Sequence, residues 1–349
     1  MTDRVLLLTP SCGLGGGIER YVATLEWSFS VQGVDYHRID LRGSGAAAHL
    51  RMLAQARTHL RSRVTSVRIV LAHRALLPLA SMVARDRRVT GISVVCHGSD
   101  VWGAPLRPRR YVEKILMSRS NVRVVAVSNF TAGVLTGSCQ ATVLPPGLSE
   151  DWYSELIDAS NTIRTQVPEV ELVTTFRLAD WRDKGLPELL GAVSALSRSD
   201  VHVTVCGSGV PSADLMQLVR RYSWCHLRAG LTDGELARQL AVADLLVLAT
   251  RTRRGRNASG EGFGLVLIEA QVAGTPVIGP AFGGSRDAYV DGVTGTSPVD
   301  ETETALGATL NEVLQDPQRL KDMGKYAAEW SRECFAPSRY AGLAVARLL

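Results

Sequence analysis

Residues 261–276 read Glu-Gly-Phe-Gly-Leu-Val-Leu-Ile-Glu-Ala-Gln-Val-Ala-Gly-Thr-Pro, a short glycine loop that runs into an apolar segment. Gly262 and Gly264 carry no Cβ, so the backbone can turn tightly there and approach a ligand closely. The apolar residues that follow predict a buried helix over 265–273, and the closing Gly-Thr-Pro predicts its end. This stretch therefore predicts a loop that opens onto a helix N-terminus.

Two carboxylates accompany this loop. Glu261 opens it, and Glu269 lies early in the predicted helix. Together with the first backbone amides of the helix, they predict a polar pocket that suits both hydroxyl and phosphate groups. The alternative is that both glutamates are solvated surface charges, and the neighbouring glycines and the apolar helix face argue against it.

Outward from this stretch, both halves of the chain alternate short β-rich runs with helical patterns. Strands are predicted at 5–8, 34–41, 67–72, 92–96, 122–127 and 141–144, and again at 172–176, 201–206, 244–249 and 276–278. Helices are predicted at 18–29, 184–197, 212–222, 233–242 and 265–273, and in the tail after residue 302. Strand and helix repetition at this spacing predicts parallel sheets covered on both faces.

The pattern breaks at Pro145-Pro146-Gly147 and then restarts, so we place a linker at roughly residues 148–168. A chain of 349 residues is long enough for two domains with separate cores. We expect an α/β protein of two Rossmann-like, doubly wound domains that face each other across a cleft. Sheets of this kind bind ligands at the carboxyl ends of their strands.

Bulk composition indicates an ordinary globular protein, with 46% hydrophobic and 21% charged residues. The apolar run near the N-terminus is too short for a secretion signal or a membrane span. Six scattered cysteines show no Cys-x-x-Cys pair and no metal-like pairing with histidine, so we interpret them as small buried residues of a reducing compartment. Cytoplasmic localisation is the expectation.

Positive charge is concentrated in the first half. Residues 42–125 hold 15 arginines and one lysine against three carboxylates, a net charge of +13, whereas the whole chain carries +5. This charge indicates either an ordinary solvated surface or attraction to an anionic acceptor or the inner face of a membrane. Nucleic acid is disfavoured, because few aromatic residues accompany the arginines.

A second glycine loop follows the first predicted strand. It reads Gly13-Leu-Gly-Gly-Gly17 and opens a predicted helix, an arrangement that exposes amides to a phosphate. The dinucleotide pattern G-x-G-x-x-G fails because Ile18 occupies its last glycine position, although Asp40 at the end of the second strand keeps a nicotinamide cofactor open. A merely tight turn is the other alternative.

Further polar residues follow predicted strands. His97 begins the sequence His-Gly-Ser-Asp after the strand 92–96, and it is either a hydroxyl contact or a structural histidine. Arg177 and Lys184 flank the loop after the strand 172–176, where two cations would suit a diphosphate leaving group. Gly207 and Gly209 form another loop of close approach. The sequence holds no Asp-x-Asp, Walker loop, Gly-x-Ser-x-Gly or His-Glu-x-x-His motif.

In this order, along nearly the whole chain, these motifs resemble the retaining family 4 glycosyltransferases, which have the GT-B fold and are also called glycosyl transferases group 1. The matching segments are the Gly-Gly-Ile-Glu-Arg of residues 16–20, His97-Gly, Val127-Ser-Asn, Pro146-Gly, Arg177…Lys184-Gly, Gly207-Ser-Gly, and Glu261-x7-Glu269. The glutamate segment within Glu-Gly-Phe-Gly…Glu-Ala…Gly-Thr-Pro-Val is the most specific of them.

The resemblance implies a role for each matching residue on the donor side. Glu269 would accept hydrogen bonds from the ribose hydroxyls of a nucleotide sugar, and Glu261 with the backbone of Gly262, Phe263, Gly264 and Leu265 would hold the donor sugar. Arg177 and Lys184 would clamp the diphosphate. The loop residues Gly16, Gly17, Gly207 and Gly209 would also approach the nucleotide sugar, and His97 would contact the sugar near its reacting face.

The resemblance also implies the domain plan and the chemistry. An acceptor domain would cover residues 1–150, a nucleotide-sugar domain 165–328, and a C-terminal helix at 329–349 would pack on the first domain. A hexose or N-acetylhexosamine would pass with retention from a nucleotide diphosphate sugar, a UDP-sugar before a GDP-sugar, to a small molecule, glycan or lipid. No metal ion or other cofactor is implied, because the two cations would take its place.

Some positions depart from the family pattern. Ala249-Thr250 stands where the family often has Pro-Ser, and a basic insert at residues 251–260 follows it as either a mobile loop or a substrate lid. The hinge is Pro-Pro-Gly rather than Pro-Asn-Gly, and Gly283-Gly-Ser-Arg-Asp replaces Gly-Gly-x-x-Glu. Two other functions therefore stay open: a GT-B epimerase or pseudo-glycosyltransferase coupling enzyme, and a non-catalytic module that binds sugar nucleotides or a membrane surface.

Overall fold

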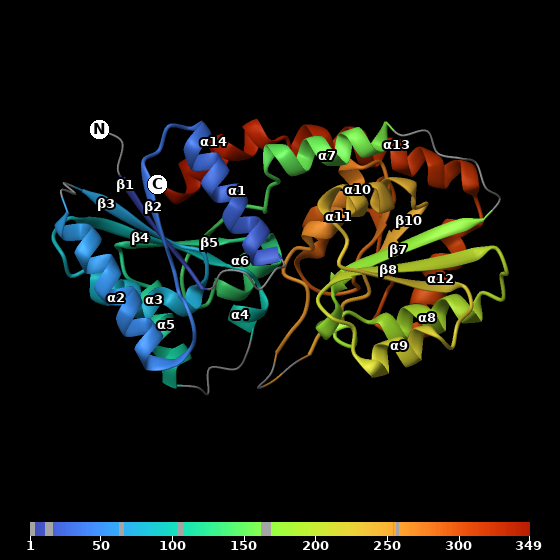
Figure 1. Ribbon diagram of the computed structural model, residues 1–349, viewed down its shortest axis with the longest axis horizontal. Helices are drawn as coiled ribbons and strands as arrows, with labels where there is room; N and C mark the ends of the chain where they lie inside the picture. The colour runs from blue at the N-terminus through green and yellow to red at the C-terminus, as the bar shows by residue number, and fades with distance from the viewer. Residues whose placement is uncertain are drawn as a thin grey trace. The chain divides into compact units, whose positions relative to one another are not determined.

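The computed structural model describes residues 4–10, 17–62, 66–102, 108–161, 169–253, 255 and 258–349. The chain divides into two compact units. The first runs through Ser149 and takes in Pro337–Leu349, and the second comprises Glu150–Arg253 and Ser259–Ala336. Each unit holds one six-stranded sheet with helices on both faces (Figure 1). The predicted α/β class with two doubly wound sheets is therefore confirmed.

The sheet of the first unit is parallel throughout. Its strands lie in the order β2 (Tyr36–Asp40), β1 (Arg4–Thr9), β3 (Val67–Leu71), β4 (Val89–Cys96), β5 (Val122–Ala126) and β6 (Ala141–Val143). Residues 5–8 of β1 have no exposed surface, because helices cover both faces of the sheet. The strand order reverses between β1 and β3, the position where doubly wound sheets bind ligands.

Two helical layers bury the faces of this sheet (Figure 1). One layer contains α1 (Gly17–Val31) packed against α14 (Pro337–Leu348), and the other contains α2 (Gly45–Arg61), α3 (Leu77–Val83) and α5 (Pro108–Met117). The shorter helices α4 (Ser99–Trp102) and α6 (Asn129–Leu135) follow β4 and β5. Alternate residues of each strand serve the two layers, as the two-residue period of a strand requires.

The C-terminal tail differs from the single helix predicted at 329–349. The structure has two helices there, α13 (Pro317–Cys334) in the second unit and α14 in the first. Pro337 begins α14, because its missing N–H is tolerated only in a first helical turn. Tyr340 packs its ring over Gly147, where a Cβ would lie 2.2 Å from a ring atom, and Ser93 of β4 donates a hydrogen bond to the Leu348 carbonyl.

The second unit repeats the architecture with a different strand order. Its parallel strands lie in the order β12 (Gly295–Thr296), β11 (Val277–Ile278), β10 (Leu245–Val247), β7 (Val170–Arg177), β8 (Val201–Ser208) and β9 (Cys225–Ala229). The order reverses between β7 and β10, so the loops after these two strands emerge side by side.

Helices again cover both faces of the sheet (Figure 1). The helices α8 (Leu186–Ala195) and α12 (Glu303–Leu314) pack together on one face, near α9 (Ala213–Val219). The other face carries α7 (Glu150–Ser160), α10 (Asp233–Val242), α11 (Leu265–Val272) and α13. Local signals fix several ends: Thr232 and Glu235 form a capping box at α10, and Asp316 caps α13.

The predicted linker at 148–168 was wrong over its first part, which is α7. Acidic residues in its first turn, Glu150 and Asp151, complement the helix dipole. Trp152, Leu156 and Ala159 form a buried stripe at helical spacing that packs on α10 and α11. Residues 162–168 of the linker lie outside the described residues.

Two strands, β9 and β12, were also missed, since β12 has two residues and β9 carries polar residues at an exposed edge. The cysteines outside position 12 are free thiols, buried at 96, 206 and 225 and half-buried at 139 and 334. Burial raises the pKa of Cys206 and of Cys225 to about 12, as expected of small core residues. Among the described residues, no helix has the length and apolarity to span a membrane.

Candidate functional site

The predicted site residues of the second unit gather where its strand order reverses. Arg177 is the last residue of β7, and Lys184 ends the loop that follows. Thr250 lies three residues after β10, and Glu261 stands before α11. The carboxyl ends of β7 and β10 are neighbours in the sheet, which brings these loops together.

One carboxylate oxygen joins three of these loops. Lys184 Nζ lies 2.9 Å from Glu261 Oε2, and Thr250 Oγ1 donates to the same oxygen at 3.0 Å. The Lys184 side chain is 25% exposed and that of Glu261 is 14% exposed, so water screens this ion pair only partly. Lys184 and Glu261 are predicted from sequence to bind separate parts of a ligand, and the structure places them in direct contact.

The backbone around this contact is tightly constrained. Gly185 has φ +71°, and a Cβ there would lie 2.0 Å from the carbonyl oxygen of Ala249. The close approach of Gly185 to Ala249 brings the loop after β7 against the chain after β10. On the other side, the Glu261 carbonyl accepts a hydrogen bond of 2.9 Å from the Gly284 amide.

The other cations of this region are also paired with carboxylates. Arg177 Nη2 lies 2.7 Å from Asp180 Oδ2 within the same loop. Arg182 stacks on the Trp181 ring at 3.9 Å and pairs with Asp214 at 2.8 Å. The loop therefore presents guanidinium and ammonium groups whose charge is balanced locally.

The basic insert after Thr250 is tied to the second unit in its described part. Arg251 pairs with Glu188 of α8 at 2.9 Å and donates to the Glu301 carbonyl, and Arg253 pairs with Asp183. Arg253 also bridges to Ser259 in antiparallel fashion. These arginines therefore have structural partners, and residues 254, 256 and 257 lie outside the described residues.

Helix α11 begins at the predicted glycine loop. Gly264 is its N-cap at φ +85°, with no side chain to cap the amides of Leu265 and the residues after it. Those amides and the helix dipole favour an anion. Phe263 is buried and packs edge-on against Phe335 at 6.2 Å, which supports the loop that contains Gly262.

Glu269 lies in the interior of α11 and is 5% exposed. Trp152 of α7 donates its indole N–H to Glu269 Oε1 at 3.1 Å. A buried carboxylate needs such a donor, because an unpaired buried charge costs several kcal/mol. The sequence pattern predicts no role for Trp152, because residues 148–168 are predicted to be a linker, although this tryptophan begins the buried stripe of α7.

The two glycines at the end of β8, Gly207 within the strand and Gly209 just after it, have different roles. A Cβ on Gly207 would lie 2.3 Å from the Phe176 carbonyl, so this glycine permits the two strand ends to pack. Gly209 has φ +92°, and no atom of the described residues lies within 4 Å of a Cβ position there. Gly207 therefore serves the fold, and Gly209 lies in an open loop.

In the first unit, His97 follows β4 and is held by its Nε2, which donates to the Ala72 carbonyl at 2.7 Å. Its ring meets Tyr21 edge-on at 5.1 Å, and Nδ1 can accept a hydrogen bond when the ring is neutral. Asp100, from the same motif, places its carboxylate 3.9 Å from His73 Nε2. Gly17 begins α1, and Gly16 lies outside the described residues.

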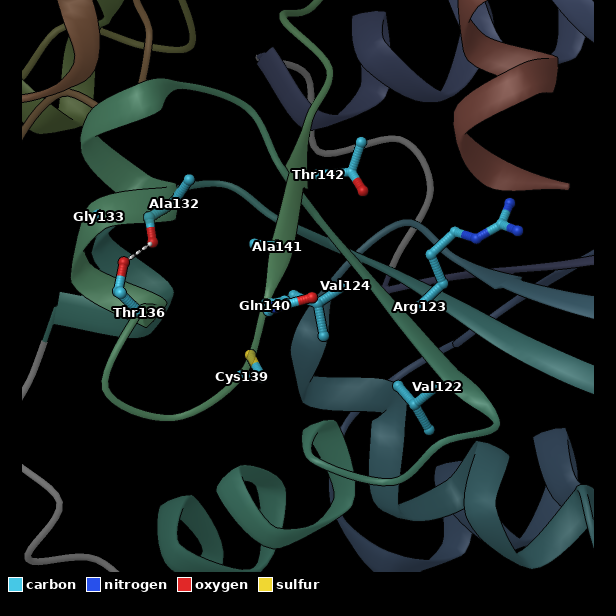
Figure 2. A pocket seen from close by; sticks show the side chains of 10 residues that line it. All are labelled: Val122, Arg123, Val124, Ala132, Gly133, Thr136, Cys139, Gln140, Ala141 and Thr142. Atoms are coloured by element: carbon cyan, nitrogen blue, oxygen red, sulfur yellow. Dashed lines mark hydrogen bonds between the residues drawn. The ribbon is translucent and has the colours of Figure 1, made fainter.

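Two further features of the described residues do not coincide with the predicted site. A pocket of about 640 Å³ lies beside α6 and the edge strand β6 (Figure 2). Its lining includes Arg123, Cys139 and Thr142 but none of the predicted site residues. Within the described parts of the chain, no group of three or more His, Cys, Asp or Glu side chains is arranged to hold a metal ion.

Comparison with known proteins gives a family match. Residues 165–330 match the family model described as glycosyl transferases group 1. A GDP-mannose-dependent alpha-(1-6)-phosphatidylinositol monomannoside mannosyltransferase from Mycolicibacterium smegmatis is 28% identical over 272 residues, covering 74% of this chain and 70% of its own. A D-inositol 3-phosphate glycosyltransferase from Arthrobacter is 32% identical over 204 residues, covering 53% of this chain and 44% of its own.

Solved structures show the same fold at low sequence identity. A sucrose-phosphate synthase from Thermosynechococcus elongatus has a TM-score of 0.77 at 17% identity, covering 98% of this chain and 97% of that one. A glycosyltransferase from Rickettsia africae has a TM-score of 0.79 at 15% identity, with the same coverage.

The constraint at Gly185 gives a test of the site's architecture. We expect Gly185→Ala to lower the free energy of unfolding by about 2–5 kcal/mol, because it adds a clash with Ala249 to the cost of a left-handed alanine. Gly209→Ala is the matched control, with a left-handed backbone and open space, and should cost about 1–2 kcal/mol. Urea unfolding measures both, and equal losses would contradict the proposed packing of the two loops.

Proposed function

Because this chain is a glycosyltransferase of group 1 with the GT-B fold, we propose that it transfers a hexose or N-acetylhexosamine from a nucleotide diphosphate sugar to a phosphate-bearing acceptor, with retention of configuration. GDP-mannose is the first donor to test, since the mannosyltransferase from Mycolicibacterium smegmatis is GDP-mannose-dependent by name. UDP-sugars, which sequence analysis placed first, are the second.

The contact between Lys184 and Glu261 is the observation that carries this proposal. An ammonium group has three protons, and Lys184 donates one of them to Glu261. The other two are available to a diphosphate, while Glu261 accepts sugar hydroxyls beside it. Lys184 would thus stabilise the growing charge on the leaving group next to the sugar that is departing from it.

Other groups near this contact would also bind the nucleotide sugar. Arg177 has five N–H donors, so it can bind a phosphate oxygen in exchange for, or in addition to, Asp180. The first amides of α11 add the positive end of a helix dipole. Glu269, held by Trp152, would take the ribose hydroxyls.

The roles of Lys184 and Glu269 predict a loss of donor binding in their variants. We expect Lys184→Ala and Glu269→Ala each to weaken GDP or UDP binding at least tenfold, since charge-assisted hydrogen bonds contribute about 1.5–3 kcal/mol. Lys325→Ala, which removes an exposed lysine that pairs with Asp322, is the control. Isothermal calorimetry measures all three, and wild-type affinity in both site variants would refute the assignment.

We further propose that the transfer needs no divalent metal ion, because Arg177, Lys184 and the α11 N-terminus supply positive charge to the diphosphate. Turnover of GDP-mannose or a UDP-sugar in excess EDTA should therefore equal turnover in added Mg²⁺ or Mn²⁺ within about twofold. A loss of activity in EDTA that Mg²⁺ or Mn²⁺ restores would contradict this part of the proposal.

The acceptor proposal rests on the first unit. Its excess of positive charge favours an anionic acceptor, and both relatives above act on inositol phosphate compounds by name. One helix face there is apolar and uncovered: Tyr111 of α5 is 62% exposed, and Val112 and Ile115 are each 46% exposed. Lys114 lies on the same exposed side of α5, while Glu113 turns inward to a buried pair with Arg74.

An exposed apolar face beside cations fits the headgroup region of an anionic bilayer. The neighbouring helix α3 adds Met82, which is exposed, and the exposed arginines 85 and 87 follow its end. We therefore propose that this face of α3 and α5 contacts an anionic lipid surface, where a phospholipid acceptor would lie.

Vesicle binding tests this surface. The chain should co-sediment with vesicles containing about 30% phosphatidylglycerol more than with pure phosphatidylcholine, and less in high salt. The double variant Val112→Ser/Ile115→Ser should bind at least threefold more weakly, because it removes buried apolar contact. Val299→Ser, at an exposed valine of the second unit, is the matched control. Equal binding of both variants would refute the assignment to α5.

A further inference from the structure

Thr250 is a buried hydroxyl residue at the centre of the proposed donor site, and no role was predicted for it. It lies three residues after β10, is 4% exposed, and donates from Oγ1 to Glu261 Oε2 at 3.0 Å. Thr250 is separated from Glu261 by the basic insert, so the contact closes a loop of the chain.

Thr250 and Lys184 both donate hydrogen bonds to the same oxygen of Glu261, Oε2. Lys184 Nζ lies 2.9 Å from Oε2, and the described residues provide no hydrogen bond to Oε1. Two donors on one oxygen fix the rotation of the carboxylate and leave the other oxygen as the acceptor. Oε2 therefore anchors the side chain, and Oε1 remains as the hydrogen-bond acceptor.

The backbone of Glu261 is held as well. Its carbonyl accepts the Gly284 amide, and Gly283 pairs beside it at φ +114°, where a Cβ would lie 2.5 Å from the Glu261 carbonyl oxygen. With the main chain fixed, the side-chain torsions are the remaining freedom of Glu261. The hydroxyl of Thr250 removes that freedom without adding charge.

From this geometry we propose that Thr250 is a positioning residue for the donor sugar. It holds Glu261 so that Oε1 accepts hydroxyls of the sugar, while Lys184 bridges Glu261 to the diphosphate. Thr250 itself contacts neither the sugar nor the nucleotide. The inference rests on the proposed function, and it assigns the effect of Thr250 to the sugar half of the donor alone.

This division predicts a difference between a nucleotide and its sugar derivative. Thr250→Val keeps the shape of the side chain and removes the hydroxyl. It should weaken GDP-mannose binding about tenfold, the effect of losing one hydrogen bond to a charged group, and change GDP binding less than twofold. Thr250→Ser should restore the binding of GDP-mannose to within about twofold of the unaltered chain. Calorimetry with each ligand measures the comparison, and UDP and UDP-glucose form a second pair.

Thr252→Val is the matched control, because the Thr252 hydroxyl is buried two residues away and has no hydrogen-bond partner in the described structure. It should leave both affinities unchanged. If Thr250→Val does not fold, Thr250→Ala replaces it, since it removes the hydroxyl without overpacking. A merely structural role for Thr250 would lower GDP and GDP-mannose affinity together.

The outcomes separate the inference from the function on which it rests. An unchanged GDP-mannose affinity in Thr250→Val, or an equal loss for GDP, would overturn the positioning role. Failure of the unaltered chain to bind either nucleotide or either nucleotide sugar would overturn the proposed function, and the inference with it. A selective loss that Thr250→Ser restores would support both.

Discussion

The hydrogen-bonded ion pair between Lys184 and Glu261 is the constraint on which the second unit's site depends. It exists because β7 and β10 are neighbours although 67 residues of chain separate Arg177, the end of one, from Leu245, the start of the other. The reversal of strand order there directs two loops to the same place, and the glycines at 185 and 283 let their backbones approach. A solvent-exposed pair would contribute little, but partial burial and a second donor, Thr250, give this one a defined geometry.

The regular part of the fold could be predicted from sequence because its physical cause is local. Parallel strands covered on both faces are nearly continuous apolar runs, as at residues 5–8, and their helices show a clear period. The secondary-structure predictions were wrong where contacts between distant parts of the chain determine which element forms. Helix α7 follows a proline-rich break, and its packing within the second unit is evident only from tertiary contacts such as that of Trp152 with Glu269. Strand β12 has only two residues and is defined by its pairing with β11.

The candidate site also contains residues that the local sequence indicates and residues that only tertiary contacts reveal. The two glutamates and the glycine loop could be proposed as site residues because they lie within sixteen residues and share one family pattern. Thr250 and Trp152 could not, since each acts on a glutamate through a contact across the fold, and a lone threonine or tryptophan carries no sequence signal. The basic insert illustrates the converse: from sequence it could be a mobile loop or a substrate lid, and only the structure shows that Arg251 and Arg253 have carboxylate partners in the same unit.

The carboxylate partners of Arg177 and Lys184 affect how the proposed donor site would bind a diphosphate. Unpaired cations at a strand edge would repel each other, so Arg177 and Lys184 are kept in place by Asp180 and Glu261. Under the proposed function, a diphosphate would use the N–H donors of Arg177 and Lys184 that Asp180 and Glu261 do not engage, which favours a ligand with several anionic oxygens. Because Glu261 also offers an oxygen to hydroxyl groups, a ligand with both a diphosphate and a sugar satisfies the region more completely than either part alone. If the proposed function holds, pairing in the free protein would thus favour an intact nucleotide sugar over inorganic anions.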